Sequence, residues 1–597
     1  MTEIPHPSPP SGSWADPRAG RPPVHPSVSE AGRLLCAGTY LDAGYRERVI
    51  DELYVHEERL AAPAYGFDTT RVLAHALRAR RMELTWAAGI LAAWFVGTVI
   101  TSGALTLLLA PFLLLSLARW LRARDLGLLR FLGVVVRVYA WWMIAVVVIA
   151  LIGLGLALGG AFGDLVGVGA LFLTDSLTGS SSSSSGPFGG PGGSSSGSGG
   201  LALWMVPLTF VGLVVLVALQ RSQVARVITG ELSRHRYADH AGDPAEATPG
   251  PRFERIRRRI RAEQHSPLVM YDVNDPLCGA GEPYYPWHLS VELRPREDLG
   301  PDRKPTPLTN THLVERIVPL LQALRVPSPH GSPQAEAAVQ DRLRELVIDE
   351  CVFVPVDGLP HRDQAPLSPQ FFAEQRAVAI EEGGERRRHF LRVRVGGWDE
   401  DLVVTVFVRV HTQGGMLMLE VAPHLLNPVH VLFYNADAEA HRYLNNNALG
   451  RAVWALVRTP ASFGASVATL ARGLAGWWRI VTGGHGGARP EGPRTSVREL
   501  AAQDNGSIFH LMDADRYLKT IQDRVVGGVT LALHEAGWHT EEFARRSAIT
   551  IAGGGTYIHS VHDSAFSVGG SGAQNTMHGK SGTGGAGGNR GSEGRGR

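Results

Sequence analysis

A cysteine and a histidine lie ten residues apart in the stretch NDPLCGAGEPYYPWH, which begins at Asn274. A cysteine becomes a nucleophile when a nearby base or cation lowers its thiol pKa, so Cys278 and His288 are candidates for covalent catalysis. From Trp287 onward, however, apolar and polar residues alternate as in a half-buried strand. The second interpretation is therefore a Gly/Pro-rich loop that leads into a strand, with His288 facing outward.

A second pair of histidines, His534 and His539, lies in the sequence HEAGWH. A zinc peptidase helix carries HExxH, with its histidines four residues apart on one face. Five residues turn a helix by roughly 500°, so these two side chains cannot share a face. Gly537 predicts the end of one helix and Thr540 the cap of the next. We predict no metal site and no cofactor.

The bulk composition places the chain in a reducing compartment. Its three cysteines, Cys36, Cys278 and Cys351, are widely spaced and form no CxxC pair. A length of 597 residues exceeds one ordinary domain, and the net charge is +2. The Pro- and Ser-rich residues 1–30 contain no apolar run, so we expect a disordered N-terminus without a cleavable signal peptide.

Apolar segments predict an α-helical membrane block of four spans at residues 84–220. As one helix, Leu84 to Leu121 would measure roughly 57 Å, whereas the hydrocarbon core is about 30 Å thick. We therefore expect two spans there, divided by the turn at residues 101–103. A third apolar run covers Val138 to Leu158, and a fourth covers Leu201 to Leu219.

Arginines predict the orientation of this block. They gather before the first span, between the second and third spans, and after the fourth, whereas residues 164–200 contain no Lys or Arg. By the positive-inside rule, the Ser/Gly-rich loop at 174–200 lies outside and both termini are cytoplasmic, in the inner (plasma) membrane. The spans lack charged residues within their apolar stretches, which favours an anchor over a transporter subunit.

The remaining sequence predicts a cytoplasmic α+β domain that contains an antiparallel β-meander. The three strands are His389 to Val395, Leu402 to His411 and Met416 to Val421, with glycines at the turns. Arg392 and Arg394 alternate with apolar residues, so we expect one face of the sheet to be wet. Flanking helices are expected, including one over Gln334 to Asp349. The predicted segments are a helical segment at 31–83, a basic juxtamembrane segment at 221–265, the α+β domain at 266–435 and a helical region at 436–548.

Two basic segments are candidates for contact with anionic inner-leaflet lipid. Six arginines lie between Arg252 and Arg261, where each can contribute about 1 kcal/mol near an anionic surface. From Ala440 to Pro490 there is no Asp or Glu, and Thr459-Pro460 predicts the start of an amphipathic helix that ends near Val481. The alternative for the first segment is a solvated helix. The alternative for the second is a helix packed on the sheet with its arginines in water. The predicted interface residues are Arg255, Arg257, Arg258, Arg259, Arg261, Arg472, Trp477, Trp478 and Arg479.

The tail at 549–597 is Gly/Ser-rich and contains a β-prone segment. Its sequence Phe566-Ser567-Val568-Gly569 resembles the amyloid-signalling motifs of bacterial sensor–effector pairs and the RIP homotypic interaction motif. Those motifs have an apolar–Gln–apolar–Gly core, and this chain has Ser567 where glutamine is expected. The resemblance implies recruitment of a protein effector by β-stacking, and the alternative is a frayed terminus. The candidate contacts are Tyr557, Ile558, Phe566 and Val568.

The chain as a whole resembles uncharacterised multi-span membrane proteins of actinobacteria. The resemblance rests on the RLLCAG sequence at Arg33, the DPLCGAG loop at Asp275 with the later Trp287, and the meander that starts at Arg388. It implies an architecture and no activity. We expect a non-enzymatic anchor or signalling scaffold whose partners are the lipid bilayer, anionic lipids and a protein effector, and no nucleic acid. The alternatives are a membrane-bound enzyme that uses Cys278 and His288, and a transporter subunit.

Overall fold

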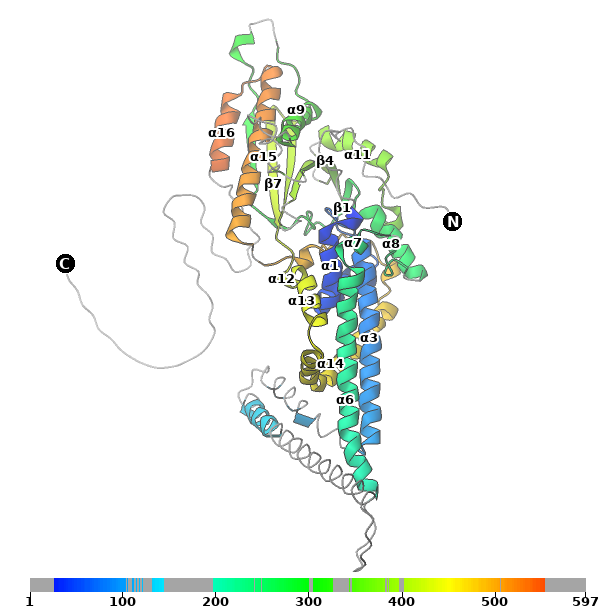
Figure 1. The fold of residues 1–597 in the computed structure, drawn as a ribbon. Coiled ribbons are helices and arrows are strands. Elements are labelled where there is room, and N and C mark those ends of the chain that lie inside the picture. The colour runs from blue at the N-terminus through cyan, green and yellow to red at the C-terminus, as the bar shows by residue number, and fades with distance from the viewer. Residues whose placement is uncertain are drawn as a thin grey trace, which may run out of the picture.

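Two hydrophobic cores, one built on a sheet and one built of helices, organise the chain (Figure 1). The structure, a computed structural model, describes residues 26–103, 131–143, 197–240, 242–247, 250–299, 304–325, 346–381, 386–396, 402–504 and 506–552, with isolated positions between these ranges.

Within the described residues, seven strands form one mixed sheet. The strand order is β1-β4-β5-β6-β7-β2, and β3 also pairs with β7. The β1–β4 pair is parallel, and the other pairs are antiparallel. The strands are β1 (Leu268–Tyr271), β2 (Glu282–Pro283), β3 (Trp287–Glu292), β4 (Val347–Pro355), β5 (Arg388–Gly396), β6 (Val403–Gln413) and β7 (Met416–Leu426).

The predicted β-meander is confirmed as β5, β6 and β7. Gln413 pairs with Met416 across a two-residue turn, in which Gly414 and Gly415 have φ values of 59° and 78°. Residues with positive φ at both turn positions match the right-handed twist of the strands, which is why glycine is needed there.

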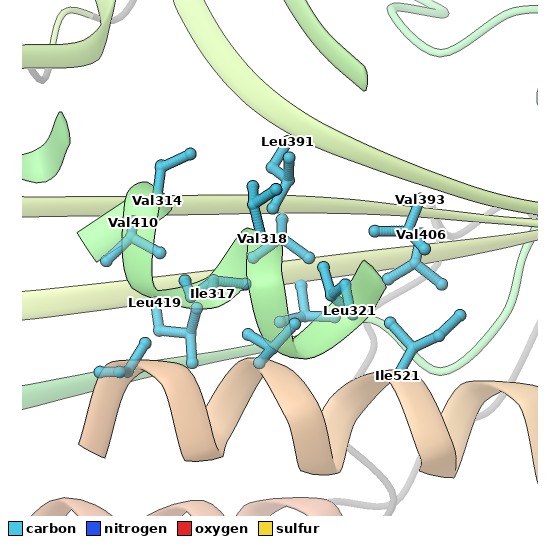
Figure 2. Close-up of a cluster of buried hydrophobic side chains, with 14 of the residues drawn as sticks. Val314, Ile317, Val318, Leu321, Leu391, Val393, Val406, Val410, Leu419 and Ile521 are labelled. Carbon is cyan, nitrogen blue, oxygen red and sulfur yellow. The ribbon is translucent and has the colours of Figure 1, made fainter. Parts of the chain in front are cut away.

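Helices α9 (Asn310–Gln322) and α15 (Ile508–Glu535) cover one face of the sheet. Figure 2 shows Ile317 of α9 beside Val410 of β6, and Ile521 of α15 near Val406 of the same strand. Burial of such side chains stabilises the domain by about 25 cal/mol per Å² of apolar surface. Another helix, α16 (Glu541–Ala552), follows α15 and contacts β3.

The opposite face of the sheet is also covered, so the expectation of a wet face is wrong. Phe353, Phe390 and Phe407 form an edge-to-face aromatic cluster there. Arg392 pairs with Asp349 and lies over the ring of Tyr65, at 4.8 Å from the ring centroid. Alternation along a strand predicts two faces, but a chain segment far away in sequence covers the polar one.

The predicted helix over Gln334 to Asp349 is wrong at its C-terminal end, because Val347–Pro355 is strand β4. The residues VIDECVFVP pair with β5 on one side and β1 on the other, which places apolar side chains on both faces. Residues 334–342 lie outside the described part of the chain.

The second core is helical, and α1, α2 and the start of α3 lie within the segment 31–83 that was expected to be helical. Asp68 caps α3 as predicted, since its side chain accepts a hydrogen bond from the backbone of Thr70. Segments distant in sequence complete this core, including Phe433 and Val497. The helices of this core are α1 (Glu30–Leu41), α2 (Ala43–Ile50), the start of α3 (Thr69–Ile100), the end of α6 (Gly197–Arg226), α7 (Arg234–Tyr237), α8 (Pro251–Glu263), α12 (Val431–Tyr434) and α13 (Ala436–Leu444).

Two helices among the described residues, α3 and α6, are long and apolar enough to cross a membrane. They contain the predicted first and fourth spans and lie side by side (Figure 1). The second and third predicted spans fall largely on residues outside the described part, although Phe131–Met143 is a shorter apolar helix. The turn expected after the first span is present, with Ser102 and Gly103 at positive φ.

Candidate functional site

The longest helix in the described part of the chain is α14 (Ala448–Thr482), which continues through Pro460. The predicted start at Thr459-Pro460 is therefore wrong: Asn447 is the N-cap and accepts a hydrogen bond from the backbone of Gly450. The Thr459 hydroxyl is not a cap, because it donates to the carbonyl of Ala455 within the helix. The C-terminal end agrees with the predicted end near Val481.

Small and hydroxyl side chains line the inner face of α14 and allow it to approach α3 closely. Trp94 donates its indole N–H to Ser462 Oγ at 3.3 Å. A Cβ built on Gly473 would lie 2.7 Å from Leu84 Cδ2, so a larger residue there would force the Leu84 side chain to move. Later residues of α14 meet earlier residues of α3, and the two helices are therefore antiparallel. The buried residues of α14 are Ala455, Thr459, Ser466, Thr469 and Gly476.

The opposite face of α14 is apolar and exposed, which is the reverse of an ordinary amphipathic helix on a soluble domain. The relative exposure reaches 73% for Leu449 and 60% for Trp478. Exposed apolar patches of this kind mark contact with a membrane or a partner. We call this face the outer face of α14, and it consists of Leu449, Val453, Leu456, Val457, Val467, Leu474, Trp477, Trp478 and Val481.

The outer face of α14 adjoins the apolar surfaces of the two candidate spans. Ala455 packs in one small core with Trp94 of α3 and Leu213 of α6. Beyond this contact, α3 exposes Phe95 and Val99, and α6 exposes several apolar side chains. The exposed apolar residues of α6 are Met205, Leu208, Val211, Val215 and Leu219.

The arginines predicted at the interface on α14 differ in their surroundings. Arg472 is exposed, and its side chain hydrogen-bonds to the carbonyl of Ala468 and to Thr469. Arg479 pairs with Asp51 of the N-terminal helical segment at 2.8 Å. Arg472 thus faces solvent, while Arg479 joins the end of α14 to the helical core.

Acidic residues of the protein itself pair with most of the arginines predicted on α8. Arg255 pairs with Glu57, Arg257 with Glu254, Arg259 with Asp363 and Arg261 with Glu246, whereas Arg258 is exposed. Each of these pairs satisfies a cation without any lipid. The apolar face of α8 packs in the helical core through Phe253, Ile256 and Ile260. Contact of its arginines with lipid stays a prediction.

The Cys278 loop is built around a carboxylate rather than around a catalytic base. Glu499 Oε1 accepts hydrogen bonds from the backbones of Gly279 and Gly281 at 2.7 and 3.0 Å. Glu499 Oε2 accepts from the backbone of Ser496 and from the Cys278 thiol. Burial and the charge of Glu499 raise the pKa of the Cys278 thiol. A thiol that donates to a carboxylate is the reverse of an activated nucleophile.

The structure does not bring His288 to this loop. His288 lies on β3 opposite Glu420 of β7 and is exposed, as the strand interpretation predicted. No hydrogen bond between Cys278 and His288 is present among the described residues. The helix end predicted at Gly537 is confirmed: α15 ends at Glu535, and Gly537 has a φ of 84°.

The predicted partner contacts Tyr557, Ile558, Phe566 and Val568 lie outside the described residues.

Sequence reasoning missed two polar clusters, because each gathers residues that are far apart in the chain. In one, the Asp243 carboxylate accepts hydrogen bonds from Arg71 and His75, both at 2.9 Å and all buried. In the other, His485 lies beside His56 and Glu58, which follow the helical turn at Asp51–Val55. The only local signals are the HEE triplet that begins at His56 and the histidine within GGHGG.

Residues 286–565, just under half of the chain, match the family model of the AbeC-like domain. The C-terminal half is similar to this family. The AbeC-like region begins next to β3 and includes α14, but it leaves out the Cys278 loop, α3 and α6. No curated protein and no solved structure matches the chain.

Proposed function

We propose that this chain is a non-enzymatic membrane anchor and signalling scaffold that presents its sheet domain at the inner leaflet. The observation that carries the proposal is the outer face of α14, which is apolar, contains no acidic residue and adjoins two helices of membrane-spanning length. A basic, Trp-containing helix with an exposed apolar face is typical of a helix that lies in the membrane interface.

The arrangement of α3 and α6 supports a topology in which the helical core and the sheet domain lie on the same side. Arg78 near the start of α3 pairs with Glu231, just after the end of α6, and Trp86 donates to Gln223 further along. Arg80, Arg81, Arg221 and Arg226 also lie at this end. By the positive-inside rule this end is cytoplasmic, and the opposite ends of α3 and α6 point outside.

The surroundings of Cys278 favour the scaffold over the membrane-bound enzyme. A nucleophilic cysteine needs a lowered pKa, while burial and Glu499 act in the opposite direction. No observation among the described residues favours the transporter hypothesis either.

Quenching by brominated lipids tests the membrane contact of α14. Full-length protein is placed in nanodiscs, and the quenched tryptophan emission is compared with that of a variant with Trp477→Phe and Trp478→Phe. Trp538→Phe is the matched control, because Trp538 belongs to the sheet domain and donates to Thr306. We expect the double variant to lose quenchable emission and the control to retain it. Unchanged quenching in the double variant would show that α14 does not reach lipid.

Affinity capture tests the recruitment part of the proposal. Full-length protein and a chain that ends at Ala552, the last residue of α16, are captured from detergent under matched conditions. A specific partner that is lost with the tail supports recruitment through residues 553–597. A partner retained by both places recognition on the folded part of the chain.

A further inference from the structure

Two histidines and a glutamate converge where the C-terminal end of α14 meets the N-terminal helical segment. His56 and Glu58 follow the helical turn η2 (Asp51–Val55), and His485 begins the short turn η8 (His485–Gly487) just after α14. Glu58 Oε1 lies 2.7 Å from His56 Nδ1 and 3.1 Å from His485 Nδ1. The two imidazole centroids are 4.4 Å apart.

These three side chains have the geometry of a metal-ligand set. One ligand atom from each residue lies within 4.8 Å of the other two. Ligand atoms around a tetrahedral Zn²⁺ are about 3.3 Å apart, given metal–ligand bonds of about 2.0 Å. Small rotations of these side chains would therefore bring the three ligand atoms to the spacing that a tetrahedral zinc ion requires. The glycines on both sides of His485, including Gly484 at a φ of 61°, leave its backbone free to adjust.

A buried and unsatisfied oxygen provides a second, independent indication of a ligand. The Glu58 side chain is 5% exposed, and its Oε2 atom has no hydrogen-bond partner in the described part of the chain. A buried carboxylate oxygen without a partner is destabilising, and a bound cation would satisfy it. Burial raises the pKa of Glu58, but hydrogen bonds and the neighbouring histidines outweigh burial, so its pKa lies below the ordinary value.

The ligand types select the metal. Imidazole nitrogens suit zinc and neighbouring transition metals, whereas calcium and magnesium take oxygen ligands. Two histidines and one carboxylate leave a fourth position open, and both histidines are partly exposed. Asp51 Oδ2 lies 3.9 Å from His56 Nε2, beyond hydrogen-bond distance, and adds a negative charge near the cluster.

We propose that His56, Glu58 and His485 bind a divalent transition metal of the zinc class. This ion would tie the end of α14 to the N-terminal helical segment, next to the Arg479–Asp51 pair. The site is independent of the scaffold proposal, because it needs neither a membrane nor a partner.

Direct metal binding tests the site in full-length protein purified through a tag without histidines. After removal of metal by a chelator, Co²⁺ is titrated and its visible absorption is recorded, followed by competition with Zn²⁺. We expect about one equivalent of Co²⁺ per chain with the intense bands of a tetrahedral site, displaced by Zn²⁺.

Variants assign this binding to the three residues. His485→Ala should weaken Co²⁺ binding by roughly tenfold or more, since an entire ligand is lost. Glu58→Gln should do the same, while the matched control His441→Ala, an exposed histidine on α13, should bind as the unmodified protein does. Thermal melts show whether each variant is folded. Absence of stoichiometric binding, or equal binding by folded His485→Ala, would overturn the proposal.

Discussion

Trp94 on α3 and Ser462 on α14 share a hydrogen bond of 3.3 Å beside a small apolar core that includes Ala455. Without Ser462, the Trp94 indole N–H would have no hydrogen-bond partner in this contact. An unpaired buried donor costs free energy. The pair therefore fixes the register of α14 along α3. It also turns the small residues of α14 inward and leaves its large apolar side chains outside.

Enlarging a small residue on the inner face of α14 should loosen this contact. Gly473→Leu would place new atoms against Leu84, where a Cβ alone would lie 2.7 Å from Cδ2. We expect the substitution to destabilise the protein by about 1–3 kcal/mol, the usual cost of overpacking. Thermal unfolding in detergent measures it. Gly464→Leu is the matched control, because nothing lies within 4 Å of a Cβ there. Equal melting temperatures would contradict the packing.

Cys278 should be unreactive in the folded protein. Its thiol is buried and donates to Glu499, and its pKa is raised, so little thiolate forms near neutral pH. Iodoacetamide labelling followed by mass spectrometry should modify Cys278 in denaturant and leave it almost unmodified in the native protein. Rapid native labelling of Cys278, faster than that of the fully buried Cys36, would restore the enzyme hypothesis.

Removing the charge of Asp243 should strongly destabilise the helical core. The carboxylate accepts hydrogen bonds from Arg71 and His75, and Asp243→Asn would leave the Arg71 cation buried without its counterion. Breaking a buried pair in this way typically costs about 3–5 kcal/mol. The melting temperature of Asp243→Asn should fall well below that of the control Asp504→Asn, which changes an exposed acid. If both variants melt together, the network does not stabilise the core.

His424 should make the sheet domain sensitive to mild acid. Burial lowers the pKa of His424 to about 4, although a hydrogen bond with the Ala422 carbonyl partly opposes this. Between pH 6.5 and 4 the unfolded chain therefore binds a proton at His424 that the folded chain does not. Stability falls as the pH is lowered through this window, by about 3 kcal/mol at most.

Thermal melts at pH 7.5 and pH 4.5 check this prediction. The unmodified protein should lose more stability on acidification than His424→Gln, which has no imidazole to protonate. His288→Gln serves as the control, because His288 is exposed on β3. An acid sensitivity that is the same in all three proteins would show that His424 does not titrate as a buried neutral group.

The sequence predicted the strands and helix boundaries that depend only on neighbouring residues. Alternating residues and the Gly414-Gly415 turn defined β5, β6 and β7, and Asp68 and Gly537 marked helix boundaries that the structure confirms. These features need only a few neighbouring residues, so the sequence alone contains enough information.

Features that depend on distant residues were not predictable in this way. The first residues of β4, up to Asp349, were assigned to a helix, because the parallel partner strand β1 lies some eighty residues earlier. Pro460 suggested a helix start, yet packing against α3 holds α14 together through it. The arginines of α8 suggested lipid, since the acids that neutralise them, such as Glu57 and Asp363, lie far away in sequence.

The helical core described above has a consequence for biosynthesis. Gly38 of α1 lies directly against the Phe433 ring, and Val497 and Ala501 close the same core. α1 and α3 therefore emerge from the ribosome long before their packing partners are synthesised. The helical core cannot form until the last third of the polypeptide has been made. By the same reasoning, the AbeC-like region cut out alone would expose Phe433 and its neighbours to water. A fragment meant to stay soluble has to retain the N-terminal helices that cover them.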